Sequence, residues 1–296
     1  MPVQSYVNGR YVPHGSAAVH IEDRGYQFSD GVYEVIAVYG GAIVDEAPHM
    51  ERLFRSLGEL NMMPPAGARS IKLIMREILR RNRIRDGAIY LQVSRGIAPR
   101  NHAYPADIKP AMVVTARALT WPRDIAEIGG IAVIAVPDQR WARPDIKSVA
   151  LLPNILDRMQ ASRAGADDAW MVADDGLVTE GTSANAWIVT EAGALVTRQL
   201  SRAILAGVTR RAIMEFAAAD GLSVTERAFS LGEAKAAREA FQTSTTALVN
   251  PVVKIDGAVI GDGAPGPVTQ RLTDLYWKLH ADPKFTTPVN YQLAGS

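Results

Sequence analysis

Hydrophobic and polar residues alternate in short segments at the start of the chain, and this pattern predicts two antiparallel hairpins. The first, SYVNGRYVP, turns at Asn8-Gly9, and the second, VYEVIAVYGGAIV, turns at Gly40-Gly41. Asn-Gly and Gly-Gly are common in two-residue hairpin turns because both residues tolerate a positive φ. Each hairpin is therefore expected to contribute two strands to a sheet.

Two amphipathic helices and two further strands are predicted to follow. Apolar residues recur every three or four positions over residues 47–60 and 68–83, as they do on the buried face of a helix. The segments AIYLQVSRG and AMVVTARAL predict strands, joined by a polar loop at 97–110. We expect residues 1–119 to form a small α+β domain, and the weakly periodic segment 120–127 to be a linker.

The rest of the chain also mixes strands and helices. The segment IAVIAVP predicts a strand, and LLPNILDRMQASRAGA predicts a helix that Pro153 breaks near its start. Paired strands are predicted in DAWMVADDGLVTEG, in NAWIVTEAGALVT and in EAFQTSTTALVNPVVKIDG. The segment ILAGVTRRAIMEFAAADG predicts a helix ending at Gly221, and VTQRLTDLYWKLH predicts the last helix. We expect a larger domain over 128–281 and a flexible tail over 282–296.

Composition and charge exclude several classes of protein. Lys and Arg number 32 against 31 Asp and Glu, and no segment concentrates the basic residues, so no nucleic-acid partner is expected. The chain has no cysteine, which excludes disulfides, thiolate zinc sites and cysteine nucleophiles; no metal site is expected. The N-terminal segment lacks a signal-peptide pattern, and no segment has the roughly 18 to 20 apolar residues that span a bilayer. We expect a cytoplasmic protein without a membrane partner.

One lysine differs from the others in its surroundings. Lys147, in the segment RPDIKSVALLPN, is enclosed by apolar residues. Apolar surroundings lower the pKa of a lysine and so supply the neutral amine that imine formation needs. The local sequence also allows, and taken alone favours, a lysine that pairs with Asp145 at a domain edge. The lysines expected to be solvated are Lys72, Lys109, Lys235, Lys254, Lys278 and Lys284.

Three separate segments have the composition of an anion site. Gly207-Val208-Thr209 precedes and opens a predicted helix, whose N–H groups and dipole favour a phosphate. Ser244-Thr245-Thr246 follows a predicted strand and offers hydroxyl groups in a turn, and Arg52 adds a forked donor. Each segment also has an ordinary interpretation: a helix cap, a turn and a helix-surface arginine.

Two further positions carry candidate chemistry. Glu180 lies where a predicted strand meets a glycine-containing turn, and its carboxylate either binds a protonated ring nitrogen or stabilises the turn. The polar loop contains Arg100 and His102 in the segment RNH. These two residues either receive a substrate carboxylate or belong to a solvated loop.

In order along the chain, these segments resemble the fold-type IV pyridoxal-phosphate enzymes, the class IV aminotransferases. The resemblance extends from about Tyr6 to Leu279 and keeps the order and approximate spacing of the family's motifs. The matching segments are RGYQFSDGVYEV, HMERLFRSL, DIKS, VTEGTSAN, GVTR and TSTT. The resemblance implies an α+β fold of two domains, with a small N-terminal domain and a larger β-barrel-like C-terminal domain flanked by helices.

The resemblance also implies a cofactor, pyridoxal 5′-phosphate, and a role for each matched residue. Lys147 is the lysine that binds the cofactor as a Schiff base, and Glu180 pairs with the pyridine nitrogen. Leu205 packs against the ring. The residues implied to hold the phosphate are Arg52, Val208, Thr209, Ser244 and Thr245.

Within the family, the segment RNH is similar to the D-amino-acid aminotransferases. The similarity implies that Arg100 and His102 bind the substrate carboxylate across a homodimer interface, together with Tyr33. This similarity implies a ping-pong transaminase that moves the amino group of a D-amino acid to a 2-oxo acid, 2-oxoglutarate or pyruvate.

Several alternatives remain open on the sequence. They are a branched-chain L-aminotransferase, an (R)-amine transaminase, an aminodeoxychorismate lyase, and a cofactor-carrying or binding protein without turnover. Three residues depart from the family pattern: Ser29, Pro153 and Ala247. These departures bear on the substrate range more than on cofactor binding.

Overall fold

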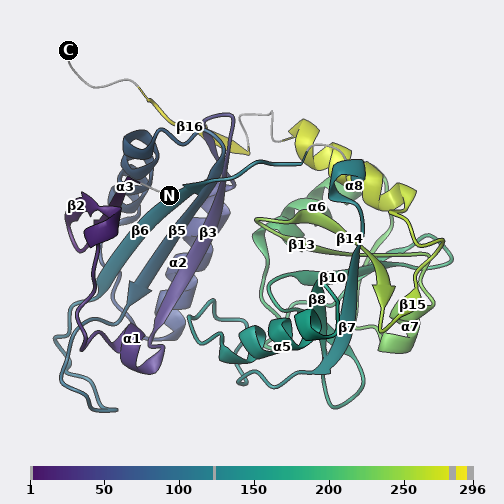
Figure 1. The fold of residues 1–296 in the computed structure, drawn as a ribbon, viewed down its shortest axis with the longest axis horizontal. Helices are drawn as coiled ribbons and strands as arrows, with labels where there is room; N and C mark the ends of the chain where they lie inside the picture. Colours follow the sequence, from purple (N-terminus) through teal and green to yellow (C-terminus); the bar gives the residue numbers. More distant parts are fainter. Residues whose placement is uncertain (1–2, 123–124, 280–284, 292–296) are drawn as a thin grey trace. The chain divides into compact units, whose positions relative to one another are not determined.

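The computed structural model describes residues 3–122, 125–279 and 285–291, without the side chain of Leu279 (Figure 1). The chain divides into two compact units. The first unit comprises Met1–Trp121, Ile146–Ala150 and His280–Ser296, and the second comprises Pro122–Asp145 and Leu151–Leu279. The chain therefore leaves the first unit, returns to it for five residues around Lys147, and returns again near its end.

In the described part of the first unit, seven strands form a sheet in the order β16-β4-β3-β5-β6-β1-β2. All neighbouring strands in this sheet are antiparallel. Both predicted hairpins are confirmed, and Asn8 and Gly9 adopt the positive φ that the first turn requires. The strands are β1 (Gln4–Val7), β2 (Arg10–Pro13), β3 (Gly31–Tyr39), β4 (Ala42–Val44), β5 (Gly87–Ser94), β6 (Ala111–Ala118) and β16 (Thr286–Pro288).

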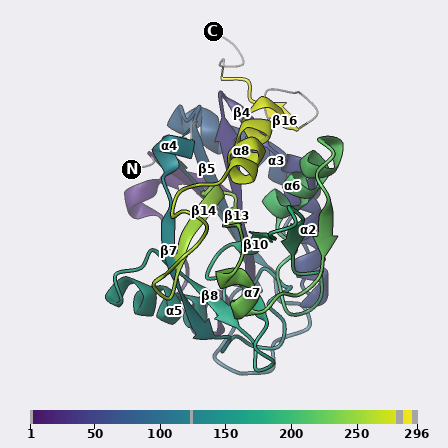
Figure 2. The same ribbon diagram turned by 90° about the vertical axis from the view of Figure 1, so that its right-hand side faces the viewer.

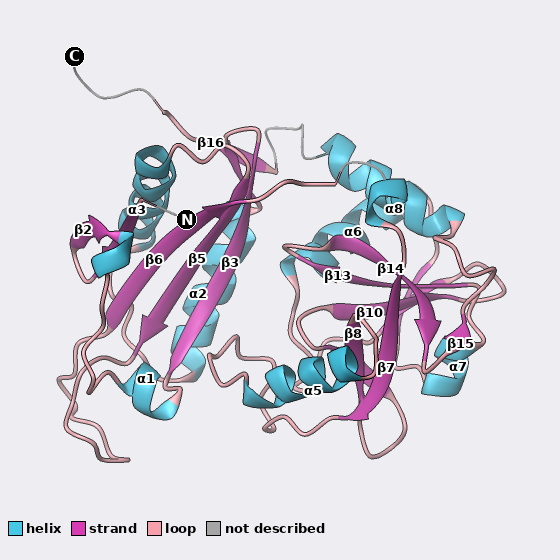
Figure 3. Ribbon diagram, viewed as in Figure 1, coloured by secondary structure: helices cyan, strands magenta, loops and turns pink. Residues whose placement is uncertain are grey.

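Two helices, both predicted from the sequence, cover this sheet (Figures 1 and 3). They are α2 (Glu46–Glu59), which packs against β3, and α3 (Ala68–Asn82), which packs against β1 and β6. Their apolar faces and the inner face of the sheet form one buried core. Two short elements were not predicted, namely η1 (His14–Ser16) and α1 (Arg24–Phe28).

The described part of the second unit contains a nine-stranded sheet in the order β12-β11-β10-β13-β14-β7-β8-β9, with β15 beside β14. Figure 3 shows that this sheet is strongly curled, in agreement with the predicted barrel-like domain. Its strands are β7 (Ile131–Pro137), β8 (Asp168–Val172), β9 (Val178–Gly181), β10 (Asn185–Val189), β11 (Leu195–Thr197), β12 (Val224–Glu226), β13 (Glu239–Ser244), β14 (Leu248–Ile255) and β15 (Ala258–Val259).

Helices flank the curled sheet, as Figure 2 shows from a second direction. The helices α6 (Val208–Ala219) and α8 (Pro267–Leu279) pack against each other and against β13, whereas α5 (Leu152–Arg163) packs against β7 and β8. The short helices are α4 (Ile125–Ile128) and α7 (Leu231–Lys235). None of the helices in the described ranges is both long and apolar enough to cross a membrane.

Three expectations from the sequence differ in detail. Pro153 does not break α5 but lies in its first turn, where no intrahelical N–H bond is required. The linker region includes Trp121, which is buried and donates a hydrogen bond to the carbonyl oxygen of Val38 at 2.9 Å. Within the expected tail, Thr286–Pro288 form β16 and pair with β4, while residues 282–284 and 292–296 lie outside the described part.

Candidate active site

In the first unit, the segment around Lys147 lies along β3 like a short additional strand. The backbone N–H of Tyr33 donates to the carbonyl oxygen of Lys147 at 3.0 Å, and that of Val149 donates to the carbonyl oxygen of Gly31 at 3.0 Å. The backbone N–H of Lys147 donates to the Ser56 hydroxyl at 3.3 Å. These bonds on both sides fix the backbone from which the lysine side chain extends.

The side chain of Lys147 is half-buried and lies over an aromatic ring. Its Nζ is 4.4 Å from the centroid of the Tyr33 ring, a cation–π distance. The alternative pairing of Lys147 with Asp145 is not observed, because the carboxylate of Asp145 accepts hydrogen bonds from Arg143 at 2.9 and 3.0 Å. The structure therefore brings together two residues singled out in the sequence, Lys147 and Tyr33.

Arg52, on α2, is buried and not a helix-surface arginine, so the ordinary interpretation of this residue is wrong. Its Nε and Nη2 donate to the two carboxylate oxygens of Glu34 at 2.8 and 2.7 Å. The Nδ1 atom of His49 lies 2.7 Å from the same carboxylate. Neither Glu34 nor His49 was singled out from the sequence, because their partners lie on a different element, 15 to 18 residues away.

The charges of this cluster follow from burial and pairing. Burial acts to raise the pKa of Glu34, but the Arg52 guanidinium and the hydrogen bonds from Arg52 and His49 outweigh it and lower the pKa to about 2. Burial lowers the pKa of His49, and the nearby Glu34 only partly opposes this. At neutral pH the cluster is thus a carboxylate, a guanidinium and a neutral imidazole whose Nδ1–H donates to Glu34.

The predicted substrate loop presents two exposed side chains, Arg100 and His102. Both lie against the ring of Phe28, at the end of α1. The Cζ atom of Arg100 is 4.6 Å from the centroid of that ring, and the centroid of the His102 ring is 5.6 Å from it. The structure therefore brings these two predicted residues together on a third that was not predicted.

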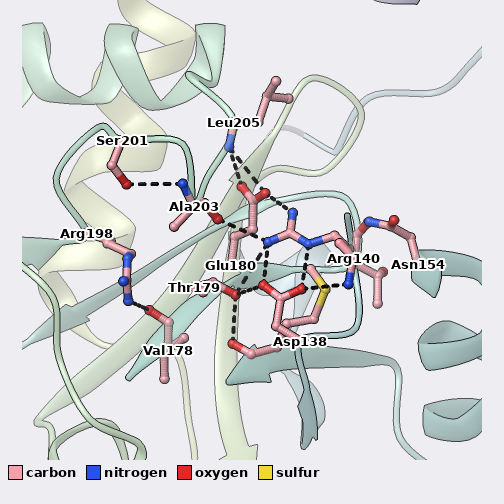
Figure 4. A network of polar contacts seen from close by, with 12 residues as sticks. Asp138, Arg140, Asn154, Val178, Thr179, Glu180, Arg198, Ser201, Ala203 and Leu205 are labelled. Carbon is pink, nitrogen blue, oxygen red and sulfur yellow. Dashed lines mark hydrogen bonds and ion pairs between the residues drawn. The ribbon is translucent and has the colours of Figure 1, made fainter. Parts of the chain in front are cut away.

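In the second unit, Glu180 lies on β9 at the centre of a buried polar network (Figure 4). Its carboxylate forms an ion pair with Arg140 and accepts the backbone N–H of Leu205 at 3.2 Å. The Asn185 side-chain amide donates to it at 2.9 Å. Asn185 lies across the turn that follows β9, whereas Arg140 and Leu205 come from distant segments, so Glu180 does more than stabilise this turn.

Arg140 connects Glu180 to a second carboxylate. It donates to the two oxygens of Asp138 at 2.9 and 2.7 Å, and to the carbonyl oxygen of Ala203 at 3.2 Å (Figure 4). Burial acts to lower the pKa of Arg140, but the carboxylates of Asp138 and Glu180 outweigh it and raise this pKa. Burial raises the pKa of Glu180, and the Arg140 charge opposes that rise. A permanently charged guanidinium thus favours the ionised form of Glu180.

The helix start predicted at Gly207-Val208-Thr209 is confirmed. Gly207 is the N-cap of α6, no side chain of the described residues caps it, and the first turn contains no acidic residue. The side chain of Thr209 is buried there. The N–H groups of a first helical turn have no partner within the helix, so this end of α6 suits an anion.

Asn185 connects this helix start to Glu180 and to the serine–threonine turn. A Cβ atom on Gly207 would lie 2.0 Å from the Asn185 side-chain oxygen, so the helix start packs directly on this amide. Asn185 also pairs with Thr243 across β10 and β13, and Ser244 and Thr245 follow at that edge. The hydroxyl oxygen of Ser244 accepts the N–H of Ala247 at 3.2 Å, which closes the turn.

The residues singled out in the sequence are thus divided between the two units. The residues in the first unit are Tyr33, Arg52, Arg100, His102 and Lys147, and those in the second are Glu180, Leu205, Val208, Thr209, Ser244 and Thr245. Arg140 was not predicted from the sequence, and Asn185 had no predicted role, although Asn185 ends the segment VTEGTSAN. Nothing local distinguishes Arg140 from Arg143, because each lies two residues from an aspartate.

This fold and these motifs define a family of enzymes: the chain belongs to the class IV aminotransferases, whose family model matches residues 31–255. It is 40% identical over 265 residues to the D-alanine aminotransferase of Bacillus licheniformis, which covers 90% of this chain and 93% of that protein. It is 38% identical over 270 residues to the D-alanine aminotransferase of Staphylococcus haemolyticus, which covers 91% of this chain and 95% of that protein.

Solved structures of the same fold include two branched-chain amino acid aminotransferases. The T.th. enzyme with pyridoxamine 5′-phosphate has a TM-score of 0.91 and 25% identity, and covers 98% of this chain and 99% of that one. The enzyme from Thermoproteus uzoniensis with norvaline has a TM-score of 0.86 and 26% identity, and covers 97% and 99%. The predicted family, the fold and the assignment as an aminotransferase are confirmed.

Proposed function

We propose that this enzyme is a pyridoxal-phosphate transaminase that moves the amino group of a D-amino acid to a 2-oxo acid, 2-oxoglutarate or pyruvate. The observation that carries the proposal is the 40% identity to a D-alanine aminotransferase along nine tenths of the chain. The branched-chain enzymes share the fold at 25 to 26% identity. The loop with Arg100 and His102 supports the same choice.

The residues of the second unit fit the cofactor. Pyridoxal phosphate carries an anionic phosphate, a basic ring nitrogen and an aldehyde. The start of α6, with its glycine N-cap and no acidic residue in the first turn, suits the phosphate, and the buried carboxylate of Glu180 suits a protonated ring nitrogen. The proposed phosphate ligands of this unit are Val208, Thr209, Ser244 and Thr245, with Leu205 against the ring, and the first unit adds Arg52.

The remaining groups belong to the first unit. We assign Lys147 to the covalent bond with the aldehyde carbon. When bound, pyridoxal phosphate withdraws electrons from the substrate Cα and weakens the bonds around it.

Each of the chain's own residues at the site then has a separate role. Glu180, which forms an ion pair with Arg140, holds a proton on the ring nitrogen. The Nζ atom of Lys147, freed when the substrate amine takes its place on the aldehyde carbon, would remove the proton from the substrate Cα and deliver it to that carbon of the cofactor. Arg100, His102 and Tyr33 bind the substrate carboxylate, and the orientation that they impose selects the Cα–H bond for cleavage. In this proposal the enzyme is a homodimer, to be checked by light scattering coupled to gel filtration.

The covalent role of Lys147 is tested by Lys147→Ala, with Lys72→Ala as the control. Lys72 is a helix-surface lysine near Glu46. We expect the Lys147 variant to lose the visible absorbance of the bound cofactor and at least about a thousand-fold in kcat. We expect the Lys72 variant to keep both. A yellow, active Lys147→Ala protein would refute the assignment.

The choice of substrate is tested with resolved enantiomers. D- and L-alanine and D- and L-leucine are offered separately with 2-oxoglutarate, and D- and L-glutamate are offered separately with pyruvate. We expect consumption of the 2-oxo acid with the D-donors. Turnover confined to L-leucine identifies a branched-chain L-aminotransferase, the alternative that the solved structures favour. Pyruvate released from aminodeoxychorismate without an amino acceptor identifies a lyase.

A further inference from the structure

The short helix α1 and the loop that carries Arg100 and His102 are joined by one buried side chain, Arg24. Its Nη1 and Nη2 donate to the carbonyl oxygens of Asn101 and His102 at 2.5 and 3.2 Å. Its Nε donates to Asp30 at 2.9 Å. The backbone of the segment RNH is therefore bound from one side by a single planar guanidinium.

The helix α1 is itself fixed to the end of β5. Asp23 is its N-cap and accepts the Gly25 N–H at 2.8 Å and the Ser94 hydroxyl at 2.8 Å. The backbone N–H of Arg24 donates to the carbonyl oxygen of Gly96 at 2.9 Å. These bonds fix α1, from which the Arg24 side chain extends. The guanidinium of Arg24 therefore holds the loop from a fixed position.

Arg95 forms a second brace beside the first. Its Nε donates to Asp30 at 2.8 Å, so this one carboxylate compensates both buried arginines. Its Nη2 donates to the carbonyl oxygen of Leu60 at 2.9 Å, and its Cζ lies 4.0 Å from the Tyr104 ring centroid. The loop is thus held before and after the segment RNH.

Phe28 restricts the side chains of Arg100 and His102, whereas Arg24 fixes the backbone of the segment RNH. The guanidinium carbons of Arg24 and Arg100 lie 4.7 and 4.6 Å from the centroid of its ring, and the His102 ring lies 5.6 Å from it. An aromatic face attracts a cation, so the ring limits the positions that the exposed Arg100 side chain adopts. Without the ring, Arg100 and His102 lose their only shared aromatic contact among the described residues.

We infer that Phe28 and Arg24 are positioning residues for the carboxylate of the amino donor. They hold Arg100 and His102 ready before a substrate arrives, and so lower the entropy lost when the carboxylate binds. This inference rests on the proposed function, because it takes the donor to be an amino acid bound through its carboxylate. It goes beyond the family motifs, which assigned no role to Phe28 or Arg24.

The first test compares Phe28→Leu with Phe28→Tyr, in cofactor-saturated protein. We expect Phe28→Leu to raise the KM for D-alanine about ten-fold and to change kcat less than about three-fold, because the cation–π contact is lost but the chemistry is not. Phe28→Tyr keeps the ring and is expected to retain the KM. Tyr26→Leu is the matched control, since Tyr26 lies on the same helix and is exposed.

A double-mutant cycle then asks whether Phe28 acts through Arg100. We expect Arg100→Ala to raise the KM, and Phe28→Leu to add less than about two-fold to it, because residues that act through each other are not additive. Arg24→Gln is expected to raise the KM as Phe28→Leu does. If Phe28→Leu does not fold, as judged by circular dichroism, Phe28→Met replaces it in the cycle.

Different results would contradict the positioning inference and the proposed function. If Arg100→Ala raises the KM but Phe28→Leu and Arg24→Gln do not, the positioning inference is overturned and the proposed function stands. If both Arg100→Ala and His102→Ala leave the KM for D-alanine unchanged, the carboxylate assignment is overturned and the inference with it. The inference is also overturned if the KM of the double mutant rises by the product of the increases that Arg100→Ala and Phe28→Leu cause separately.

Discussion

Arg52 and Glu34 form a buried ion pair with two separate hydrogen bonds, at 2.8 and 2.7 Å. Two-point contact fixes the plane of a guanidinium as well as its position. Arg52 is the residue of the first unit that we propose as a phosphate ligand, so Glu34 sets the orientation of the guanidinium that would bind the phosphate. The pair also makes the stability of the enzyme depend on pH.

The pH dependence of stability is the first prediction. The pKa of Glu34 is lowered from its usual 4.5 to about 2, so the unfolded chain binds the proton more tightly. The resulting stabilisation, about 3 kcal/mol, is fully present above about pH 4.5 and is lost as the pH falls toward 2. Urea unfolding of the wild type and of Glu34→Gln measures it. We expect the difference between them to shrink from pH 7 to pH 3, and a constant difference would contradict the assignment.

The second prediction concerns Arg140. Its removal in Arg140→Gln leaves the buried carboxylates of Glu180 and Asp138 without their cation, and we expect a loss of about 3 to 5 kcal/mol in the free energy of unfolding. Arg140→Lys keeps the charge but not the fork, and should lie between this variant and the wild type. The control is Arg211→Gln, which removes an exposed ion pair with Glu215 and is expected to cost less than about 1 kcal/mol. Equal losses for the two glutamine variants would show that the network does not act as described.

The third prediction isolates the contact between Gly207 and Asn185. Gly67 and Gly207 are both helix N-caps with extended backbones, but only at Gly207 would a Cβ atom meet a neighbour within 4 Å. Alanine at either position costs about 1 kcal/mol as a poorer cap. In Gly207→Ala the clash with Asn185 adds about 1 to 3 kcal/mol, which corresponds to a roughly 5- to 150-fold weaker cofactor affinity. Equilibrium titration with pyridoxal phosphate compares the two variants, and equal affinities would contradict the prediction.

The fourth prediction separates two contributions of Tyr33. Tyr33→Phe keeps the ring beside the Lys147 side chain and removes the hydroxyl proposed to bind the substrate carboxylate. It should raise the KM for the D-amino acid and leave the affinity for pyridoxal phosphate unchanged. Tyr33→Leu removes the ring as well, and with it the contact to Lys147, so it should also lower the affinity for pyridoxal phosphate in an equilibrium titration. Identical behaviour of the two variants would rule out a role for the ring.

Regular patterns in the sequence predicted most of the fold. The strands and long helices follow from alternation and from three- and four-residue spacing, which report which face of each element is buried. Elements of three to five residues, such as α1 and β16, are too short to show a period. Their positions depend on partners elsewhere, such as the Gly96 carbonyl for α1 and strand β4 for β16.

The candidate site could be predicted only where a motif or its immediate neighbours carried the information. Lys147 differs from the other lysines through the apolar residues beside it, and the helix start at Val208 follows a glycine. Arg140 and Glu34 have no such local signal. Arg140 pairs with Glu180, 40 residues away, and Glu34 pairs with Arg52, 18 residues away, so these contacts exist only in the folded chain.

The path of the chain between the two units has a consequence for its synthesis. The first unit lacks its Lys147 segment until residue 150 has been made, and it lacks the edge strand β16 until residue 288. During synthesis, the edge strand β4 of the N-terminal sheet therefore has no β16 to pair with until almost the whole polypeptide has been made. Folding of this unit cannot finish from the N-terminus onward, and its last step comes after the second unit has been synthesised.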